Sequence, residues 1–208
     1  VIAAATAALG MGALIAAPAA QAQEQFVPLL VYRTGQFAPL GIPWGDGKQD
    51  YLKLVNAKGG INGVKIAFEE CETAYDTAKG VECYERFKTK AGVSSFDTQS
   101  TGITFAVSAK APGDKMPVVT PGYGLSQSAD GRAFEWNFPL LGNYWTAADS
   151  MIQDILKKEK GNLKGKKIAL VYHDSPYGKE PIPLLQKRAA KDGFELMLLP
   201  VTAPGMEQ

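Results

Sequence analysis

Histidine and cysteine are scarce in this sequence of 208 residues, which contains one histidine and two cysteines. A closed structural zinc site needs four cysteine or histidine ligands at a characteristic spacing, so we expect no metal site. Net charge is also nearly absent, since 22 lysines and arginines are balanced by 21 aspartates and glutamates. Phosphate backbones and anionic membranes bind clustered positive charge, and we therefore expect no nucleic-acid partner.

Long apolar runs are absent after the first 22 residues. Residues 1–22 carry no charge and end in Ala-Gln-Ala, a small-residue pattern of the kind that signal peptidase cleaves. The alternative is a membrane anchor, but Pro18 interrupts a run that is already short for a span of about 20 residues. We expect residues 1–22 to be a cleaved signal peptide and the mature protein to be periplasmic. The sequence opens on Val1 without a basic segment, so we expect it to be truncated at its start.

Export affects how the two cysteines are interpreted, because disulfides form in oxidising compartments. A bond between Cys71 and Cys83 closes a loop of about 12 residues, which stabilises a fold by about 3 kcal/mol in the chain-entropy model. Two buried thiols are the alternative, because spacing alone does not show whether the Cβ atoms converge. We predict a disulfide between Cys71 and Cys83.

From Gln25 onward, short apolar runs alternate with longer amphipathic segments, an order typical of a parallel sheet with crossover helices. The expected strands are residues 26–32, 64–68, 93–96, 117–120, 168–172 and 194–201, and residues 134–138 are a weaker strand-like run. Helices are expected around residues 44–58, at residues 77–87, from residue 100, around residues 148–156 and around residues 185–189. Trp44, Tyr51, Leu52 and Val55 form the expected core stripe of the first helix, and Asp76 is the expected N-cap of the second. The predicted fold class is α/β.

Residues 122–144 are rich in glycine, serine, proline and aromatic residues, and we expect the chain to cross there between two lobes. The α/β pattern then restarts with a helical stripe that consists of Ala148, Met151, Ile152, Ile155 and Leu156. We assign residues 23–138 to an N-terminal α/β lobe and residues 139–208 to a partial second α/β lobe. The second sheet has barely begun at Gln208, so we expect the sequence to be truncated at this end as well.

Three motifs suggest an enzyme, but the context of each argues against it. His173, Asp174 and Ser175 are adjacent, whereas a catalytic triad needs side chains that converge from separate positions. Residues 161–167 precede a strand, although a phosphate loop follows one, and Gln127 occupies the place of the third glycine of a dinucleotide fingerprint. We expect no enzyme and no cofactor. A secreted α/β hydrolase that uses His173 is a remote alternative.

Polar and aromatic residues follow the expected strands, where ligands bind in parallel α/β sheets. Ser100 and Thr101 stand where a helix begins, so their hydroxyls and the free backbone N–H groups suit a carboxylate, although N-capping explains them equally well. The aromatic candidates for an apolar pocket are Phe37, Trp44, Tyr123, Tyr144, Trp145 and Tyr177, of which Trp44 is equally suited to core packing.

Four segments carry a family resemblance, in matching order and spacing: residues 34–41 (TGQFAPLG), 56–66 (NAKGGINGVKI), 120–122 (TPG) and 172–178 (YHDSPYG). They resemble the branched-chain amino-acid-binding proteins of ABC importers, which are type I periplasmic binding proteins. The turn at residues 56–63 is the most specific element, and the resemblance covers the chain after Ala22. It implies a two-lobe protein that is not an enzyme, binds a small-molecule ligand between the lobes and delivers it to a membrane permease. We expect a monomer.

The resemblance also implies roles for individual residues. Ser100 corresponds to the hydroxyl that holds the ligand carboxylate, and Tyr177 corresponds to the ring that the second lobe contributes. Tyr123 and Gly124 correspond to the next contact pair, but the amino-acid binders have a hydroxyl where this sequence has Gly124. An α-amino group therefore loses one partner, and burying an unpaired ammonium costs on the order of several kcal/mol. With Thr101 and Phe37, these residues form the predicted ligand site.

Two questions stay open at the level of sequence. An amide, an aromatic acid or another short carboxylate is as credible a ligand as leucine. A sensor that binds a small amide or carboxylate and feeds a regulator would share the whole fold with an importer subunit.

Overall fold

The computed structural model describes residues 24–122 and 124–202. The predicted signal peptide of residues 1–22 and the predicted contact Tyr123 lie outside the described residues. Within the described ranges, no helix combines the length and the hydropathy that a membrane span requires.

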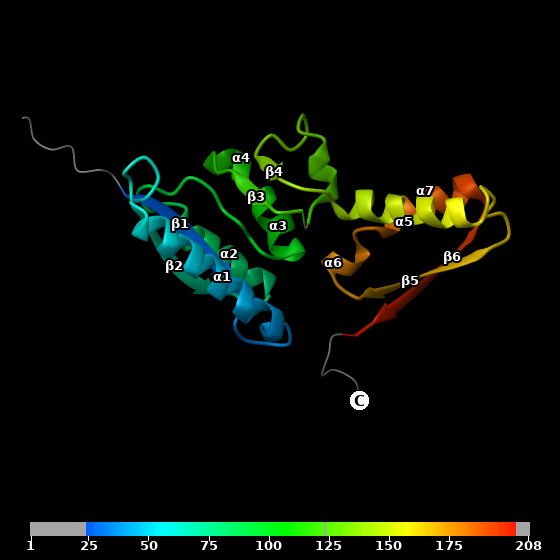
Figure 1. The fold of residues 1–208 in the computed structure, drawn as a ribbon, viewed down its shortest axis with the longest axis horizontal. Helices are drawn as coiled ribbons and strands as arrows, with labels where there is room; N and C mark the ends of the chain where they lie inside the picture. Colours follow the sequence, from blue (N-terminus) through cyan, green and yellow to red (C-terminus); the bar gives the residue numbers. More distant parts are fainter. Residues whose placement is uncertain (1–23, 123, 203–208) are drawn as a thin grey trace, which may run out of the picture.

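The first lobe contains parallel strands in which neighbouring strands are far apart in the sequence (Figure 1). Strand β1 (Gln25–Val31) pairs in parallel with β2 (Ile66–Glu72), and β3 (Val118–Thr120) pairs in parallel with β4 (Asn137–Pro139). Single bridges connect residues 93–97 to β1 on one side and to β3 on the other. The strand expected at residues 93–96 is therefore a series of isolated bridges that joins the two strand pairs.

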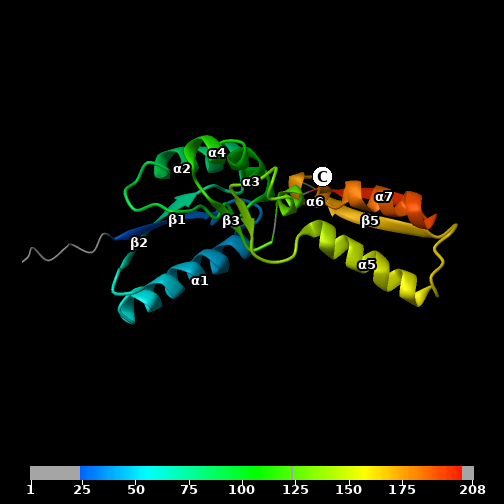
Figure 2. The same cartoon turned by 90° about the horizontal axis from the view of Figure 1, so that it is seen from above.

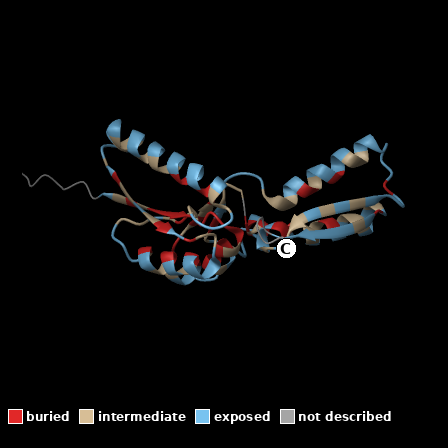
Figure 3. Cartoon of the chain, turned by 90° about the horizontal axis from the view of Figure 1, so that it is seen from below, coloured by how far each residue is buried: buried red, intermediate tan, exposed pale blue. Residues whose placement is uncertain are grey.

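Helices lie on both sides of this first sheet (Figure 2). One side carries α1 (Ala38–Ala57), and the other carries α2 (Thr77–Phe87), α3 (Thr101–Ser108) and the short α4 (Ala111–Asp114). The carboxylate of Asp76 accepts a hydrogen bond of 2.9 Å from the backbone N–H of Lys79, so the predicted N-cap of α2 is confirmed. The main core lies on the α2 and α3 side, where Tyr84, Phe87, Phe96, Ile103 and Val107 are fully buried (Figure 3).

The turn between α1 and β2 depends on Asn56, the first residue of the segment 56–63. Its side-chain amide donates a hydrogen bond of 2.7 Å to the carbonyl of Ile66 and accepts one of 2.8 Å from the N–H of the same residue. The end of α1 is thereby fixed to the start of β2, and a tight turn closes between Ile61 and Val64.

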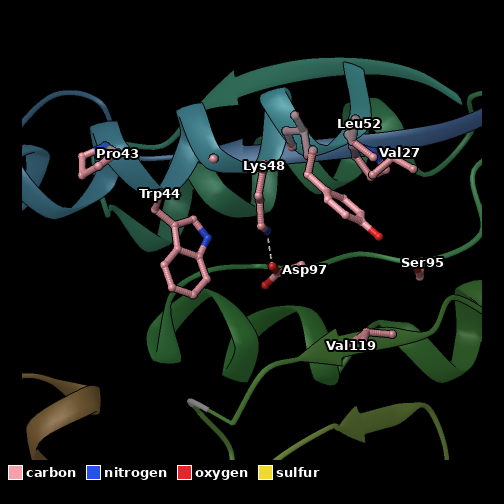
Figure 4. A pocket seen from close by; sticks show the side chains of 12 residues that line it. Val27, Pro43, Trp44, Lys48, Leu52, Ser95, Asp97 and Val119 are labelled. Carbon is pink, nitrogen blue, oxygen red and sulfur yellow. Dashed lines mark hydrogen bonds and ion pairs between the residues drawn. The ribbon is translucent and has the colours of Figure 1, made fainter. Parts of the chain in front are cut away.

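The core stripe expected in α1 is wrong. Trp44 is 43% exposed and Tyr51 is 66% exposed, whereas Gly41 and Gly45 are the buried residues of the helix. A Cβ on Gly41 would lie 1.9 Å from the carbonyl oxygen of Tyr32, so α1 approaches the sheet through its glycines. Its apolar side chains border a groove of about 550 Å³ that no described segment covers (Figure 4). Trp44 therefore borders an open groove instead of a closed core.

As far as the structure describes it, to Thr202, the second lobe consists of two parallel strands and three helices. The helices are α5 (Tyr144–Lys158), α6 (Pro176–Lys179) and α7 (Ile182–Asp192), and the strands are β5 (Lys167–His173) and β6 (Glu195–Val201). A second core cluster, separate from the first, is formed by Ala148, Ile152, Leu163, Leu185 and Phe194. The expected boundary between residues 138 and 139 stays a prediction.

Two burial predictions for this lobe are wrong. The strand expected to be buried, residues 168–172, is only half-buried on alternate residues, and Val171 is 63% exposed. Helices α5 and α7 share one core with Ile168, Leu170 and Leu196, so they cover only one face of the two strands within the described residues. Met151, expected in the helical stripe, is 65% exposed.

The predicted disulfide is confirmed. Cys71 lies near the end of β2, Cys83 lies in the middle of α2, and their Cα atoms are 5.8 Å apart. Both residues are buried in the first core, so the bond ties the edge of the sheet to the helix that covers it.

Replacing both cysteines by alanine should lower the free energy of unfolding by about 3 kcal/mol, because the unfolded chain regains the entropy that the closed loop removes. Denaturant unfolding of the variant and the wild-type protein measures this difference, and wild-type protein unfolded in reductant serves as the matched control. Two thiols that react with an alkylating reagent in the native, unreduced protein would contradict the disulfide.

Candidate ligand-binding site

The two lobes meet where the strands of both sheets end, with α3 of the first lobe facing α6 of the second (Figure 1). A cavity of about 380 Å³ lies at this junction. From the first lobe it is lined by Gln36, Phe37, Tyr75, Thr77, Ser100 and Gly102. From the second lobe and its end it is lined by His173, Asp174, Ser175, Pro176, Tyr177 and Thr202. The cavity is therefore built jointly by loops from both lobes.

The loops of the first lobe adopt strained backbone conformations at the cavity. Ala74, Tyr75 and Gln99 have φ angles of 49°, 62° and 55°, a region that residues with a Cβ rarely occupy. The loop after β2 is held by Thr73, whose hydroxyl donates to the carbonyl of Val31 at 2.9 Å and accepts from the N–H of Tyr75 at 3.2 Å. Such strain persists only where surrounding contacts enforce it, and it is concentrated at functional sites.

Ser100 is the N-cap of α3 and is only 2% exposed. Its Oγ accepts the N–H of Ile103 at the long distance of 3.5 Å, and Ser100 lines the cavity together with Tyr75. Burial raises the pKa of Tyr75, so the phenol stays neutral beside the serine. Ser100 therefore both caps the helix and lines the cavity, with the first N–H groups of α3 beside it.

Aromatic side chains form most of the remaining surface. The ring of Phe37 lies 4.7 Å from that of Tyr75 and 5.4 Å from that of His173, and the rings of Tyr144 and Tyr177 are 5.4 Å apart. An adjoining cavity of about 200 Å³ shares three of these residues, Phe37, Tyr75 and Tyr177. Its other lining residues are Tyr32, Leu40, Trp44, Gln99 and Tyr144. Burial raises the pKa of Tyr32 and Tyr144, so these phenols are neutral hydrogen-bonding groups.

The structure brings three of the predicted site residues together at one cavity: Ser100, Phe37 and Tyr177. Thr101 is buried in the first turn of α3, and its hydroxyl has no hydrogen-bond partner among the described residues. Gly124 packs directly against Thr101, since a Cβ on the glycine would lie 2.6 Å from the Cα of Thr101. That close approach is a physical reason for glycine at this position, where the resembled amino-acid binders have a hydroxyl.

Tyr75 and His173 are two of the cavity residues that are absent from the predicted ligand site. Tyr75 was missed because the second strand was predicted to end at residue 68, whereas β2 runs to Glu72 and places the next loop at the cavity. His173 is predicted to lie in a loop at the carboxyl end of a strand, where ligands bind in parallel sheets, but it is not among the predicted site residues. Both of its ring nitrogens are buried and have no hydrogen-bond partner among the described residues.

Glu180 connects the two lobes behind the cavity. Its carboxylate is buried and accepts a hydrogen bond of 2.8 Å from the N–H of Ser126, in the short helix η1 (Ser126–Ala129). Its backbone carbonyl accepts a hydrogen bond of 2.9 Å from the indole of Trp145. Burial raises the pKa of Glu180 although the hydrogen bonds from Ser126 oppose the shift. Within the described residues, no group of three His, Cys, Asp or Glu side chains is arranged to hold a metal ion.

These observations define a two-lobe α/β protein with a cavity at the carboxyl ends of its parallel strands. The family described as periplasmic binding protein matches residues 24–206, and the chain belongs to this family. Solved structures that share its fold include substrate-binding proteins of ABC transporters.

Individual relatives span a range of similarity. The Leu/Ile/Val-binding protein homolog 3 of Brucella melitensis is 24% identical over 172 residues, which cover 83% of this chain and 45% of the relative. A structure from the Pseudomonas fluorescens group, described as an ABC transporter permease, is 43% identical and has a TM-score of 0.74. The match covers 89% of this chain and 46% of the chain in that structure. The isoleucine-bound protein LivJ of Streptococcus pneumoniae is 19% identical, has a TM-score of 0.66 and shares the fold. The match covers 89% of this chain and 51% of the LivJ chain. The chain thus spans about half the length of the relatives it matches.

The raised pKa of Glu180 predicts a pH dependence of stability. A carboxyl whose pKa is higher in the folded protein than in the unfolded chain binds its proton more readily in the folded protein. Its contribution to the free energy of unfolding is therefore greatest below pH 4.5, the ordinary pKa of glutamate, and declines as the pH rises through the raised pKa of the folded state. The Glu180→Gln variant keeps an oxygen for the N–H of Ser126 and should lose this decline. Denaturant unfolding across this pH range, compared between wild type and variant, measures the effect.

The exposed Glu135→Gln variant is the control for removing one negative charge. If the difference in unfolding free energy between wild type and Glu180→Gln is constant with pH, the carboxyl has the same pKa in the folded and unfolded states and the prediction is wrong.

Proposed function

We propose that this protein is the extracytoplasmic solute-binding subunit of an ABC importer. It captures a small carboxylate or amide, a class that includes the branched-chain amino acids, between its two lobes and delivers it to a membrane permease. The observation that carries the proposal is the joint cavity, in which buried Ser100 of the first lobe faces His173 and Tyr177 of the second.

The chemistry of the first-lobe wall suits an anionic or carbonyl oxygen. The N-terminus of α3 presents the first backbone N–H groups of the helix and the positive end of the helix dipole, and both favour negative charge. The hydroxyl of Ser100 adds a donor at the same place, and Gly102, in the first turn, lines the cavity without a side chain to obstruct it. A ligand carboxylate at this position therefore replaces water with several aligned donors.

The remaining parts of the proposal concern export, closure of the lobes and recognition by the permease, and they follow from the family. Residues 1–22 are the export signal, removed by signal peptidase, which leaves a monomer in the periplasm. The lobes close on the ligand by rotating about the segment between Thr120 and Tyr144, in the manner of hinged binding proteins. The closed form is the one that the permease recognises.

Two substitutions at Ser100 separate ligand binding from helix capping. Ser100→Ala should weaken the binding of a small carboxylate by about 1 to 3 kcal/mol, because a hydrogen bond to a charged oxygen is lost. Ser100→Asp retains an N-cap acceptor, so α3 should keep its stability while the added negative charge repels a ligand carboxylate. Calorimetry on the full-length protein with L-leucine, benzoate, 4-hydroxybenzoate and benzamide measures the affinities, and thermal unfolding measures the stability.

Thr89→Ala removes an exposed hydroxyl of the first lobe and is the matched control. Unchanged carboxylate affinity in both Ser100 variants would reduce this residue to a helix cap. Uptake of the bound solute by cells that carry the cognate permease distinguishes an importer subunit from a sensor.

A further inference from the structure

We propose that Glu72 is a positioning residue for ligand binding. Its carboxylate clamps together the two first-lobe loops that carry Phe37 and Tyr75, and it thereby sets the shape of the cavity before a ligand arrives. Glu72 is not among the described residues that line the cavity, so it acts through the residues of these loops. The inference rests on the proposed function, because it concerns the cavity in which that function places the ligand.

The carboxylate of Glu72 holds both loops at once. Its Oε2 accepts a hydrogen bond of 2.8 Å from the N–H of Arg33. Its Oε1 accepts one of 2.7 Å from the N–H of Ala74, and it accepts from Thr34 both the hydroxyl at 3.1 Å and the N–H at 3.4 Å. Arg33 and Thr34 follow β1, whereas Ala74 follows β2, so a single side chain joins the ends of two neighbouring strands.

The loop after β2 depends on such contacts because its backbone is strained. Ala74 and Tyr75 are consecutive residues with positive φ angles of 49° and 62°. Each has its N–H held by the side chain two residues earlier, which is Glu72 for Ala74 and Thr73 for Tyr75. Of these two side chains, Glu72 is the one that also reaches the loop after β1. Its carboxylate therefore fixes the strained loop relative to a second loop.

The clamped loops supply the aromatic wall of the first lobe. The rings of Phe37 and Tyr75 lie 4.7 Å apart and line the same cavity. The loop backbones are close as well, since a Cβ on Gly35 would lie 3.3 Å from the carbonyl oxygen of Ala74. Without the carboxylate, water satisfies the freed N–H groups in many arrangements, and the loops regain conformational freedom. Ligand then binds at full strength only to the fraction of molecules that have both rings in place, so the apparent affinity falls.

The first lobe has other contacts that keep it folded when Glu72 is replaced. The side chain of Glu72 lies on the surface. The guanidinium of Arg33 is held separately, by Glu70 at 2.6 Å and by Asp46 at 2.7 Å. Cys71, the preceding residue of β2, is fixed to α2 by the disulfide. Replacing Glu72 should therefore loosen the two loops and leave the lobe folded.

Calorimetry on the full-length protein tests the clamp through ligand affinity. The probe is whichever of L-leucine, benzoate, 4-hydroxybenzoate and benzamide binds the wild type most tightly. Glu72→Ala should weaken binding by about tenfold, and Glu72→Gln, which keeps one carbonyl oxygen as an acceptor, should recover part of this loss. Glu82→Ala removes an exposed carboxylate of α2 in the same lobe, and this matched control should bind as the wild type does.

A second measurement needs no ligand and reports the position of the loops directly. In full-length protein with protonated phenylalanine and tyrosine in a deuterated background, the ring protons of Phe37 should give nuclear Overhauser cross peaks to those of Tyr75. Glu72→Ala should lose these cross peaks, whereas Glu82→Ala should keep them. The Phe37→Leu variant assigns the cross peaks, and thermal unfolding confirms that each variant is folded.

Cross peaks that are intact in Glu72→Ala would overturn the clamp, whether or not the affinity changes. Wild-type affinity in the same variant would overturn its role in ligand binding. Loss of folded structure in Glu72→Ala would make Glu72 a structural residue of the lobe and would also overturn the proposal. Failure of all four compounds to bind the wild type would contradict the proposed function itself, and the cross peaks would still test the clamp.

Discussion

Parallel pairing is the constraint on which the site depends. Parallel strands of one sheet end at the same edge, and each lobe of this protein has its strands paired in that way. The register of β1 against β2 places the loops after Val31 and Glu72 side by side, and the register of β5 against β6 places His173 beside Val201. Two edges made in this way then face each other, so side chains that are distant in sequence meet in one cavity.

The energetic cost of this arrangement is located where the ligand is expected. Positive φ angles at Tyr75 and Gln99, and imidazole nitrogens of His173 that have no hydrogen-bond partner among the described residues, both cost folding free energy at the cavity. The disulfide between Cys71 and Cys83 counteracts part of this cost, because it fixes the strand that precedes the strained loop to α2. A stable first lobe can therefore present a strained, polar edge to its partner lobe.

Local signals in the sequence predicted most of the elements but not all of the site. The spacing of apolar residues and the N-caps Asp76 and Ser100 located α2 and the start of α3, because capping is a short-range interaction that the sequence itself contains. The exposure of Trp44 and Val171 was not predictable, since burial depends on whether another segment covers a face. Tyr75 was not predicted for a related reason. Glu70 and Glu72 extend β2 beyond the apolar run because Arg33 pairs with both, and such pairing between distant residues is not visible in the local sequence.

Function also depends on what the lobes share. Glu180 links the two lobes, because its carboxylate accepts from the N–H of Ser126 and its backbone carbonyl accepts from the indole of Trp145. Gly124 has no side chain, so the segment that connects the lobes can pack against Thr101. The open groove beneath α1 is the rival location for a small molecule, because it is larger than the cavity between the lobes. Its walls, however, all come from the first lobe, so a molecule bound there would not join the two lobes.

Hydrogen exchange of the full-length protein distinguishes these two locations most directly. It is measured with and without saturating 4-hydroxybenzoate or L-leucine, whichever binds more tightly. Binding between the lobes predicts that exchange slows together in residues 100–104 of the first lobe and residues 173–178 of the second. Slowed exchange confined to residues 43–52 of α1, with both of those segments unchanged, would contradict the account.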